Sequence, residues 1–317
     1  MRTLKIKRAF LFLLGFIFFL FPGQSWYLTV QSVYQPPKTQ AIEIPNLPLT
    51  DYPVNVAKTE TPFLTAQAAV VMDRDSAVLL YGKNEQVKLL PASTVKIMTA
   101  LVALDYYDLN NILTVEEVNG QGQDMKLVKG EEISVENLMY GVLVASANDA
   151  ASVLAQKYPS GEQGFMAAMN DKAKELSLND TYFANPTGLD SDKWGNLLTA
   201  RSYTTALDLA RLASWAMRSE VLAKMVATPQ ITVSDTSGKR QHQLYTINEL
   251  LGYLPGIKGI KTGWTEEAGE CLASYTEREG RGIITVVLGS GNRFGETARL
   301  VEWAFSNHQW EKITPSI

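Results

Sequence analysis

The sequence contains a single cysteine, Cys271, so neither an intramolecular disulfide nor a multi-cysteine metal site can form. Histidine is almost as scarce: His242 and His308 are the only two, and no His-x-x-x-His pair exists. A Gly-x-Ser-x-Gly elbow is also missing, which disfavours a Ser-His-Asp hydrolase. These absences remove the commonest metal and histidine chemistries, so we expect no metal and no cofactor, and we predict Cys271 to be a buried small side chain.

An excess of basic charge is also missing. Lysine and arginine number 29 against 33 acidic residues, giving a net charge of −4 and a pI of about 5.4. This balance provides no basic field for a phosphate backbone, so nucleic acid is excluded as a partner. Hydrophobic residues make up 46% of the chain, enough for a sizeable core in one large domain or two small ones.

The N-terminus has the charged-then-apolar order of an export signal. Four basic residues within "MRTLKIKR" precede the apolar run "AFLFLLGFIFFLF". Residues 9–30 carry no charge and end near Trp26 and Tyr27, a length that also suits a retained membrane anchor. Residues 1–30 are therefore predicted to be a signal peptide, cleaved after Ser25, or a signal anchor. Either alternative places the rest of the chain outside the cytoplasm.

The remaining chain divides into a linker and one domain. Residues 31–62 are rich in proline without helical periodicity, and we predict an extended linker there. From Phe63 the pattern predicts a hairpin (66–73 and 77–84), followed by helices at 92–106, 134–145 (with Ser134 as its N-cap), 161–178 and 204–219. Three antiparallel strands follow at 256–264, 269–277 and 281–290, and a helix closes the chain at 293–308. The predicted fold class is α+β, an antiparallel sheet flanked by helices with a mostly helical subdomain.

The stretch "PASTVKIMTALVAL" places Ser93 and Lys96 one helical turn apart on the same face. A lysine in a first turn is unfavourable as a cation, because the helix dipole repels it. A neutral amine avoids that repulsion and is also a base, although neutrality at pH 7 requires lowering its pKa by roughly three units, about 4 kcal/mol. The apolar residues that follow, and a second nearby cation, are the means of lowering it. The plainer alternative is an N-capping serine beside an ordinary lysine.

Two further motifs follow in the sequence. Ser146-Ala147-Asn148 lies between two helical runs, where Asn148 also suits an N-cap. Lys261-Thr262-Gly263 lies on a predicted strand, where Gly263 would let a substrate backbone lie close to the strand. Each motif alone is weak. Together and in this order, Ser-x-x-Lys, Ser-x-Asn and Lys-Thr-Gly form the signature of penicillin-binding proteins and class A β-lactamases.

The sequence resembles the low-molecular-weight penicillin-binding proteins, the serine-type D-alanyl-D-alanine carboxypeptidases (peptidase family S11). The stretches "LYGKNEQVKLLPASTVKIMTALVAL", "TYFANPTGL", "YTTALDLARLA" and "GIKGIKTGWTEEAGECLAS" carry the resemblance. It covers about residues 64–306 and implies a transpeptidase-like fold with a catalytic domain at 63–317. Many relatives carry a C-terminal β domain and a C-terminal membrane helix, and we expect neither here.

The resemblance implies removal of the terminal D-Ala from peptidoglycan stem peptides. Ser93 would be the nucleophile, Lys96 its general base and Ser146 a proton relay close to Lys261. The backbone N–H groups of Ser93 and Trp264 would form the oxyanion hole. Substrate-binding roles would fall to Asn148, Lys261, Thr262 and Gly263. β-Lactams would act as inhibitors, no cofactor is implied, and the N-terminal segment would associate with the membrane.

One departure from the family concerns a carboxylate-binding arginine. Some relatives carry an arginine shortly upstream of Lys-Thr-Gly, whereas the matching stretch here, "LYTINELLG", has none. Arg240 and Lys258 are the candidate substitutes, and the sequence does not decide between them.

Three alternative functions remain open at this stage. A DD-endopeptidase would use the same residues on cross-linked peptides. A class A β-lactamase would add a glutamate in a Glu-x-x-Leu-Asn loop, which "ELSLN" from Glu175 to Asn179 matches; its charged flanks favour coincidence. A non-catalytic wall-binding protein is disfavoured because all three motifs are intact.

Overall fold

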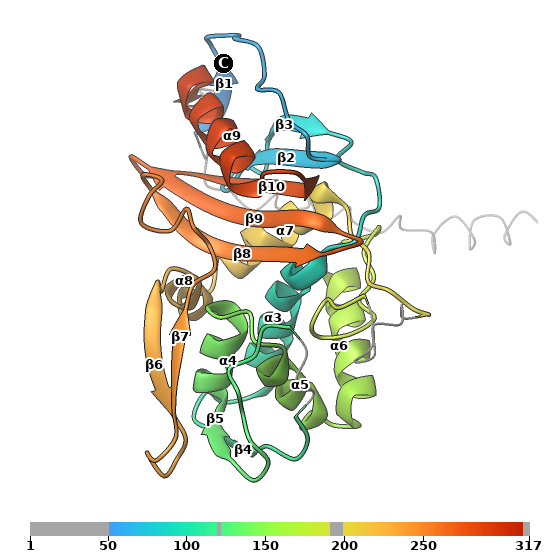
Figure 1. The fold of residues 1–317 in the computed structure, drawn as a ribbon. Helices are drawn as coiled ribbons and strands as arrows, with labels where there is room; N and C mark the ends of the chain where they lie inside the picture. Colours follow the sequence, from blue (N-terminus) through green and yellow to red (C-terminus); the bar gives the residue numbers. More distant parts are fainter. Residues whose placement is uncertain (1–50, 119–121, 191–198, 313–317) are drawn as a thin grey trace, which may run out of the picture. The chain divides into compact units, whose positions relative to one another are not determined.

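The computed structural model describes residues 51–118, 122–190 and 199–312, which are built around a five-stranded antiparallel sheet (Figure 1). Its strand order is β3-β2-β10-β9-β8. The strands are β2 (Ala68–Asp73), β3 (Leu79–Lys83), β8 (Ile257–Thr265), β9 (Gly269–Arg278) and β10 (Arg281–Ser290). The predicted signal or anchor at 1–30 and the linker up to residue 50 lie outside the described residues. Among the helices that the structure describes, none is both long and apolar enough to cross a membrane.

The sheet joins strands from the two ends of the domain, as the sequence predicted. β2 pairs with β10, bringing Val70 opposite Val286. β9 and β10 are joined by Glu279 and Gly280, both with positive φ (50° and 74°). Two consecutive residues with positive φ are the signature of the tight turn whose twist matches an antiparallel hairpin. The fold class predicted from the sequence is confirmed.

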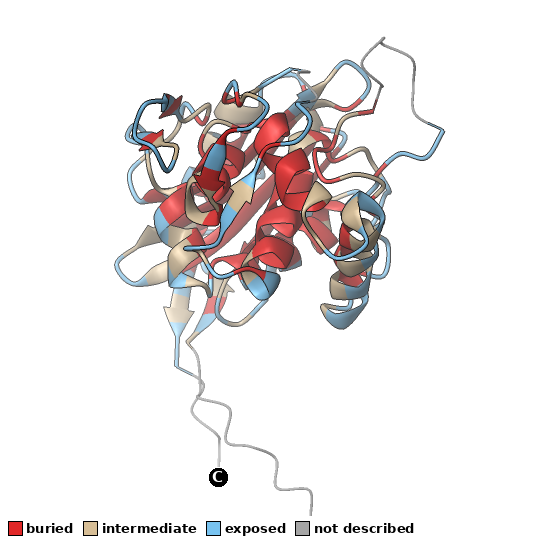
Figure 2. Ribbon diagram, turned by 90° about the horizontal axis from the view of Figure 1, so that it is seen from below, coloured by how far each residue is buried: buried red, intermediate tan, exposed pale blue. Residues whose placement is uncertain are grey.

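The two faces of the sheet are covered by different helices. α9 (Arg293–Asn307) packs on β9, β10 and β2, and its Leu300 and Val301 belong to the smaller apolar cluster. α7 (Ala206–Ala216) packs on the opposite face, at the edge of the larger cluster that fills the helical part. Figure 2 shows buried residues gathered in the interior helices and sheet, with exposed residues on the outer surfaces. β8 forms one edge of the sheet, and among the described residues its outer side has no strand partner.

The helical part begins with η1 (Ala92–Val95), a turn of 3-10 helix that leads directly into α3 (Lys96–Tyr106). The other helices are α4 (Val135–Leu143), α5 (Asn148–Gln156), α6 (Gly161–Glu175), α7 and α8 (Glu220–Val226). All predicted helices are present. Ser134 is the N-cap of α4, and its side chain accepts a hydrogen bond from the Asn137 N–H.

Three small antiparallel pairs were not predicted. β4 (Ile112–Thr114) pairs with β5 (Glu132–Ser134), and β6 (Gln230–Ser234) pairs with β7 (Gln241–Tyr245). β1 (Tyr52–Asn55) pairs with β11 (His308–Glu311). β1 lies inside the stretch expected to be a linker, so chain N-terminal to Phe63 belongs to the folded unit. β1 forms because it pairs with β11 at the far end of the chain. Local sequence patterns do not reveal such long-range pairing.

Candidate active site

Ser93 and Lys96 face one another at the start of α3. The Lys96 side-chain nitrogen, Nζ, lies 3.1 Å from Ser93 Oγ, 2.6 Å from Asn148 Oδ1 and 2.7 Å from the Thr187 carbonyl oxygen. The Lys96 side chain is fully buried, whereas Ser93 is partly exposed. The Ser93 side chain does not cap the helix: Pro91 precedes η1 without a side-chain cap. The N-capping alternative for Ser93 is therefore wrong.

Two glycines fix the backbone of Ser93 from opposite parts of the fold. A Cβ on Gly263 of β8 would lie 3.0 Å from the Ser93 nitrogen, and one on Gly188 would lie 2.0 Å from the Ala92 carbonyl oxygen. Ala92 itself has a φ of +47°, a conformation that costs a non-glycine residue about 1–2 kcal/mol. The backbone that lies close to Gly263 is thus that of the η1 turn. From the sequence we expected a substrate backbone there. Packing on both sides holds the turn that presents Ser93.

Burial lowers the pKa of Lys96 well below its ordinary value, and the nearby Lys261 lowers it further. Asp124 and Asp149 oppose the shift but do not reverse it. Lys261 is also fully buried, and burial together with the charge of Arg293 lowers its pKa to about 7. The second cation expected near Lys96 is therefore present. A buried lysine that is neutral near pH 7 is competent to act as a base.

The Ser-x-Asn motif lies between α4 and α5. Asn148 is the first residue of α5, preceded by Ala147 as a cap without a side-chain bond. Its side-chain oxygen accepts from Lys96 instead of capping the helix, so the capping interpretation of Asn148 is wrong. Ser146 is buried in a left-handed conformation (φ +59°), and it lines the same pocket as Ser93. The fold therefore places the Ser-x-Asn motif beside the Ser-x-x-Lys motif.

A cavity of about 400 Å³ gathers the motif residues. Ser93, Ser146 and Asn148 lie on its helical side. Thr262, Gly263 and Trp264 line it from β8, with the Trp264 side chain 61% exposed at the rim. The remaining lining residues are Gly122, Gln123, Leu189, Ile247, Thr265, Glu266 and Arg293. Six of the eight site residues named from the sequence line this pocket. The other two, Lys96 and Lys261, are buried.

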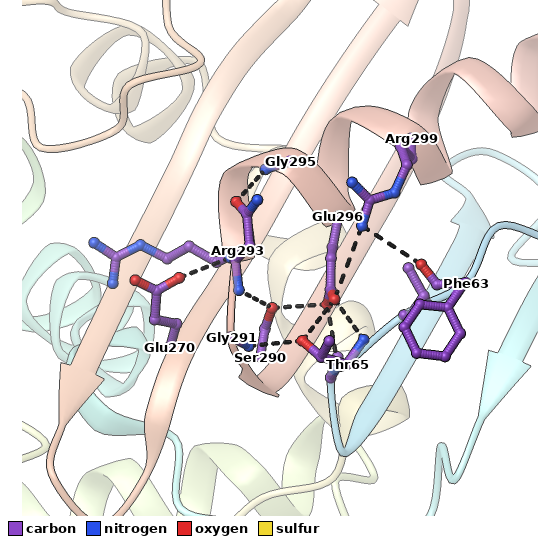
Figure 3. Close-up of polar contacts among 12 residues, drawn as sticks. Phe63, Thr65, Glu270, Ser290, Gly291, Arg293, Gly295, Glu296 and Arg299 are labelled. Carbon is purple, nitrogen blue, oxygen red and sulfur yellow. Dashed lines mark hydrogen bonds and ion pairs between the residues drawn. The ribbon is translucent and has the colours of Figure 1, made fainter.

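Arg293 is the cation that the sequence analysis missed. It is the first residue of α9, and its guanidinium Nη1 donates to the Gly263 carbonyl oxygen at 2.9 Å. Its backbone N–H donates to Glu270 at 2.8 Å, and its Nε is buried without a hydrogen bond to any described residue. Figure 3 shows the network that holds this helix end: Glu296 accepts from Thr65 and Ser290. A cation in the first turn of a helix was the available signal, because the dipole disfavours it there.

Neither substitute suggested from the sequence reaches the site. Lys258 forms an ion pair with Glu277 at 3.0 Å, and Arg240 is exposed in the β6–β7 turn. Neither lines the pocket, whereas Arg293 does. Cys271 is fully buried, and burial raises the pKa of its thiol to about 11, as expected for a packing residue. Among the described residues, no cluster of three or more His, Cys, Asp or Glu side chains is arranged to hold a metal ion.

Residues 55–292 match the family model described as D-alanyl-D-alanine carboxypeptidase, Peptidase_S11. The chain belongs to this family. D-Alanyl-D-alanine carboxypeptidase DacF of Bacillus subtilis is 32% identical over 254 residues, covering 77% of this chain and 63% of that protein. A D-alanyl-D-alanine endopeptidase of Pseudomonas aeruginosa is also 32% identical, covering 76% of this chain and 77% of that protein. The crystal structure of the Streptomyces K15 DD-transpeptidase is similar with a TM-score of 0.72 and 28% identity, covering 78% of this chain and all of that one.

The Glu-x-x-Leu-Asn match to β-lactamases lies away from the pocket of this carboxypeptidase family member. Glu175 is the last residue of α6, and its carboxylate pairs with Lys172 at 2.8 Å. Its side chain is 59% exposed and does not line the site. The match is therefore a coincidence of sequence, as its charged flanks indicated.

The "TYFANPTGL" stretch, which carried part of the family resemblance, has a structural role that the sequence did not reveal. The Asn185 side-chain oxygen accepts from the backbone of Thr187 and Gly188, at 3.1 and 2.7 Å. This turn directs the Thr187 carbonyl toward Lys96 and brings Gly188 against Ala92. Thr187 and Gly188 are thus part of the site that holds the Ser93–Lys96 pair.

Proposed function

We propose that this protein is a serine DD-carboxypeptidase that removes the terminal D-Ala from peptidoglycan stem peptides. The observation that carries the proposal is the 3.1 Å contact between Ser93 Oγ and a fully buried Lys96 whose pKa is well below the ordinary value. Neutral Lys96 accepts the proton of Ser93 as Oγ bonds to the carbonyl carbon of the penultimate D-Ala. The carbon–nitrogen bond then breaks, and the amine leaves as D-Ala after gaining a proton through Ser146, with Lys261 nearby. Water later releases the shortened peptide from Ser93.

Substrate binding would depend on the part of the pocket lined by Arg293. Thr262 on β8 and Arg293 from α9 both line the pocket and would bind the terminal carboxylate, because charge-assisted hydrogen bonds to carboxylates are the strong ones. The open edge of β8 would pair with the peptide, and Asn148 would hold it from the other side. The N–H groups of Ser93 and Trp264 would stabilise the oxyanion. The close approach of Gly263, the neighbour of Trp264, to the Ser93 nitrogen supports a joint role of these two N–H groups.

The same residues make β-lactams the expected inhibitors, since acylation of Ser93 would leave a slowly hydrolysed ester. We infer that the domain acts outside the cytoplasm, where its substrate lies, and that the basic and apolar N-terminal segment either anchors it to the membrane or is removed after export. The described part of the folded unit includes β1, ahead of Phe63.

The test is D-alanine release from a pentapeptide ending in D-Ala-D-Ala, with the full chain and its Ser93→Ala variant. Release by the wild type and none by the variant supports the proposal. Cleavage of a cross-linked peptide dimer without release from the pentapeptide would instead favour the endopeptidase alternative, which the Pseudomonas relative exemplifies. Failure of a fluorescent penicillin to label Ser93 would contradict any serine DD-peptidase.

A further inference from the structure

The segment between β4 and β5 contributes one wall of the pocket. We call residues 122–131 the wall loop; its Gly122 and Gln123 line the cavity. From α5, the Asn148 N–H donates to the Gln123 carbonyl at 2.7 Å. The Asp149 carboxylate accepts from the N–H groups of Met125 and Leu127, at 3.1 and 3.0 Å. The wall loop is thus attached to the residue next to Asn148, which contacts Lys96.

A second attachment comes from β7 through His242. Its Nδ1 lies 2.7 Å from the Met125 carbonyl oxygen, and its Nε2 lies 2.6 Å from Glu131 Oε1. The other Glu131 oxygen accepts from the Val128 N–H at 3.1 Å. A carbonyl and a carboxylate only accept, so both contacts are hydrogen bonds when the ring carries a proton on each nitrogen. His242 and Glu131 are 8% and 3% exposed, so their contact is buried.

The wall loop is held in a conformation that it would not adopt alone. Lys126, between Met125 and Leu127, has a φ of +63°, in the left-handed region that non-glycine residues rarely occupy. Such residues persist where the surrounding structure overdetermines them. Here Asp149 binds the N–H groups on both sides of Lys126, and His242 binds the preceding carbonyl. Removal of either partner would let this turn relax.

We propose that His242 and Glu131 are a positioning pair for the reaction at Ser93. Neither lines the pocket; both act through the wall loop, which keeps Gly122 and Gln123 at the cavity and Asn148 beside Lys96. His242 is on β7 and Glu131 is at the end of the wall loop, so the pair also ties the β6–β7 hairpin to this wall. Ile247, two residues after the hairpin, lines the pocket. The proposal rests on the proposed function only in its choice of peptide substrate.

A purely structural role makes a different prediction. Replacing a buried ion pair by well-packed apolar residues is often neutral or stabilising. The double variant His242→Phe/Glu131→Leu would then keep both stability and activity. If the pair positions the wall loop, the double variant keeps most of its stability but still loses the bond to the Met125 carbonyl, and with it activity.

The experiment uses the full chain and measures the rate constant for Ser93 acylation by a fluorescent penicillin, with kcat and KM for D-alanine release. We expect His242→Phe and the double variant to acylate about ten- to a hundredfold more slowly, because small misplacements near a reacting group have effects of this size. The loss should appear mainly in kcat, and His242→Gln, which retains one donor, should recover part of it. Amide hydrogen exchange in residues 122–128 should quicken in parallel.

The matched control is His308, the only other histidine. It is also buried, its Nδ1 lies 2.9 Å from the Ala304 carbonyl oxygen, and it packs beside Trp303 at the end of α9. His308→Phe should leave acylation unchanged whatever its effect on Tm. Folded His242→Phe protein that acylates at the wild-type rate would overturn the proposal, as would faster exchange in the wall loop without slower acylation.

The same experiments also decide the proposal if His242→Phe does not fold, or if the wild type releases no D-alanine. If His242→Phe does not fold, Glu131→Leu replaces it, because leucine is similar in size but has no acceptor for His242 Nε2 or for the Val128 N–H. Unchanged acylation in that variant overturns the proposal. If the wild type releases no D-alanine but is acylated, the proposed carboxypeptidase reaction fails while acylation rates still test the pair.

Discussion

Lys96 supplies the base of the proposed chemistry, because burial holds its pKa well below the ordinary value. Replacing it by methionine keeps its length and apolar stem but removes the base. We expect the Lys96→Met variant to acylate with a fluorescent penicillin about a thousandfold more slowly than the wild type, within the range measured for loss of a general base. Stopped-flow labelling measures this directly.

The control for this substitution is Lys258→Met on the same strand as Lys261. Lys258 is half exposed, paired with Glu277 and away from the cavity, so its removal should leave acylation unchanged. Wild-type acylation in Lys96→Met would mean that another group accepts the Ser93 proton.

Arg293 affects both substrate and Lys261. Its positive charge lowers the pKa of Lys261, so Arg293→Gln should raise that pKa from about 7 and move the corresponding inflection of the kcat/KM profile to higher pH. The same variant should lower kcat/KM about ten- to a hundredfold, because a charge-assisted bond to the substrate carboxylate is lost. Both effects are read from D-alanine release between pH 5 and 9. Arg240→Gln should show neither, and an unshifted inflection in Arg293→Gln would contradict the coupling.

At the level of single elements, the sequence predicted those with strong local periodicity and missed those defined by partners far along the chain. β2, β8, β9 and β10 follow from apolar runs bounded by turns. The β6–β7 hairpin was missed because "QHQLY" places His242 beside Leu244 on the inward face, where an apolar residue is the usual signal. The three motifs were found from their short signatures and their order along the chain, whereas Arg293 reaches the site only through the packing of α9 on the sheet.

The turn containing Gly188 gives a prediction that separates strain from collision. Gly188 and Gly238 both have positive φ, 79° and 69°, but only at Gly188 would a Cβ meet other atoms. Gly238→Ala should therefore cost about 1–2 kcal/mol for the left-handed conformation alone. Gly188→Ala should cost distinctly more, about 3–5 kcal/mol, and should slow acylation because the clash falls on the carbonyl before Ser93. Urea unfolding and penicillin labelling of both variants provide the comparison; equal effects would mean that the Gly188 contact is unimportant.

For the whole molecule, the two buried lysines determine how stability changes with pH. In the unfolded chain Lys261 stays protonated up to about pH 10.4, whereas in the folded protein it loses its proton near pH 7. The unfolded state therefore binds more protons between these values, so the free energy of unfolding should rise with pH across this window, by as much as about 4–5 kcal/mol from Lys261. Lys96 acts in the same direction.

Buried tyrosines limit this rise. Burial raises the pKa of Tyr107 and Tyr275, so their contribution is present below about pH 10 and is lost as they ionise in the unfolded chain. We expect maximal stability near pH 9–10, measured by urea unfolding at successive pH values. Lys261→Met should flatten the rise between pH 7 and 10, and an unchanged slope in that variant would contradict the assignment.

The two glycines beside Ser93 come from segments that are far apart in the sequence: Gly188 lies between α6 and α7, and Gly263 lies on the edge strand. Ser93 is therefore reactive only when the segment with Gly188 and the strand with Gly263 have both packed against the η1 turn. Penicillin labelling then reports more than activity. In a refolding experiment it should appear only in the last, concerted step, after helix content has recovered, so the antibiotic becomes a time-resolved probe of tertiary assembly.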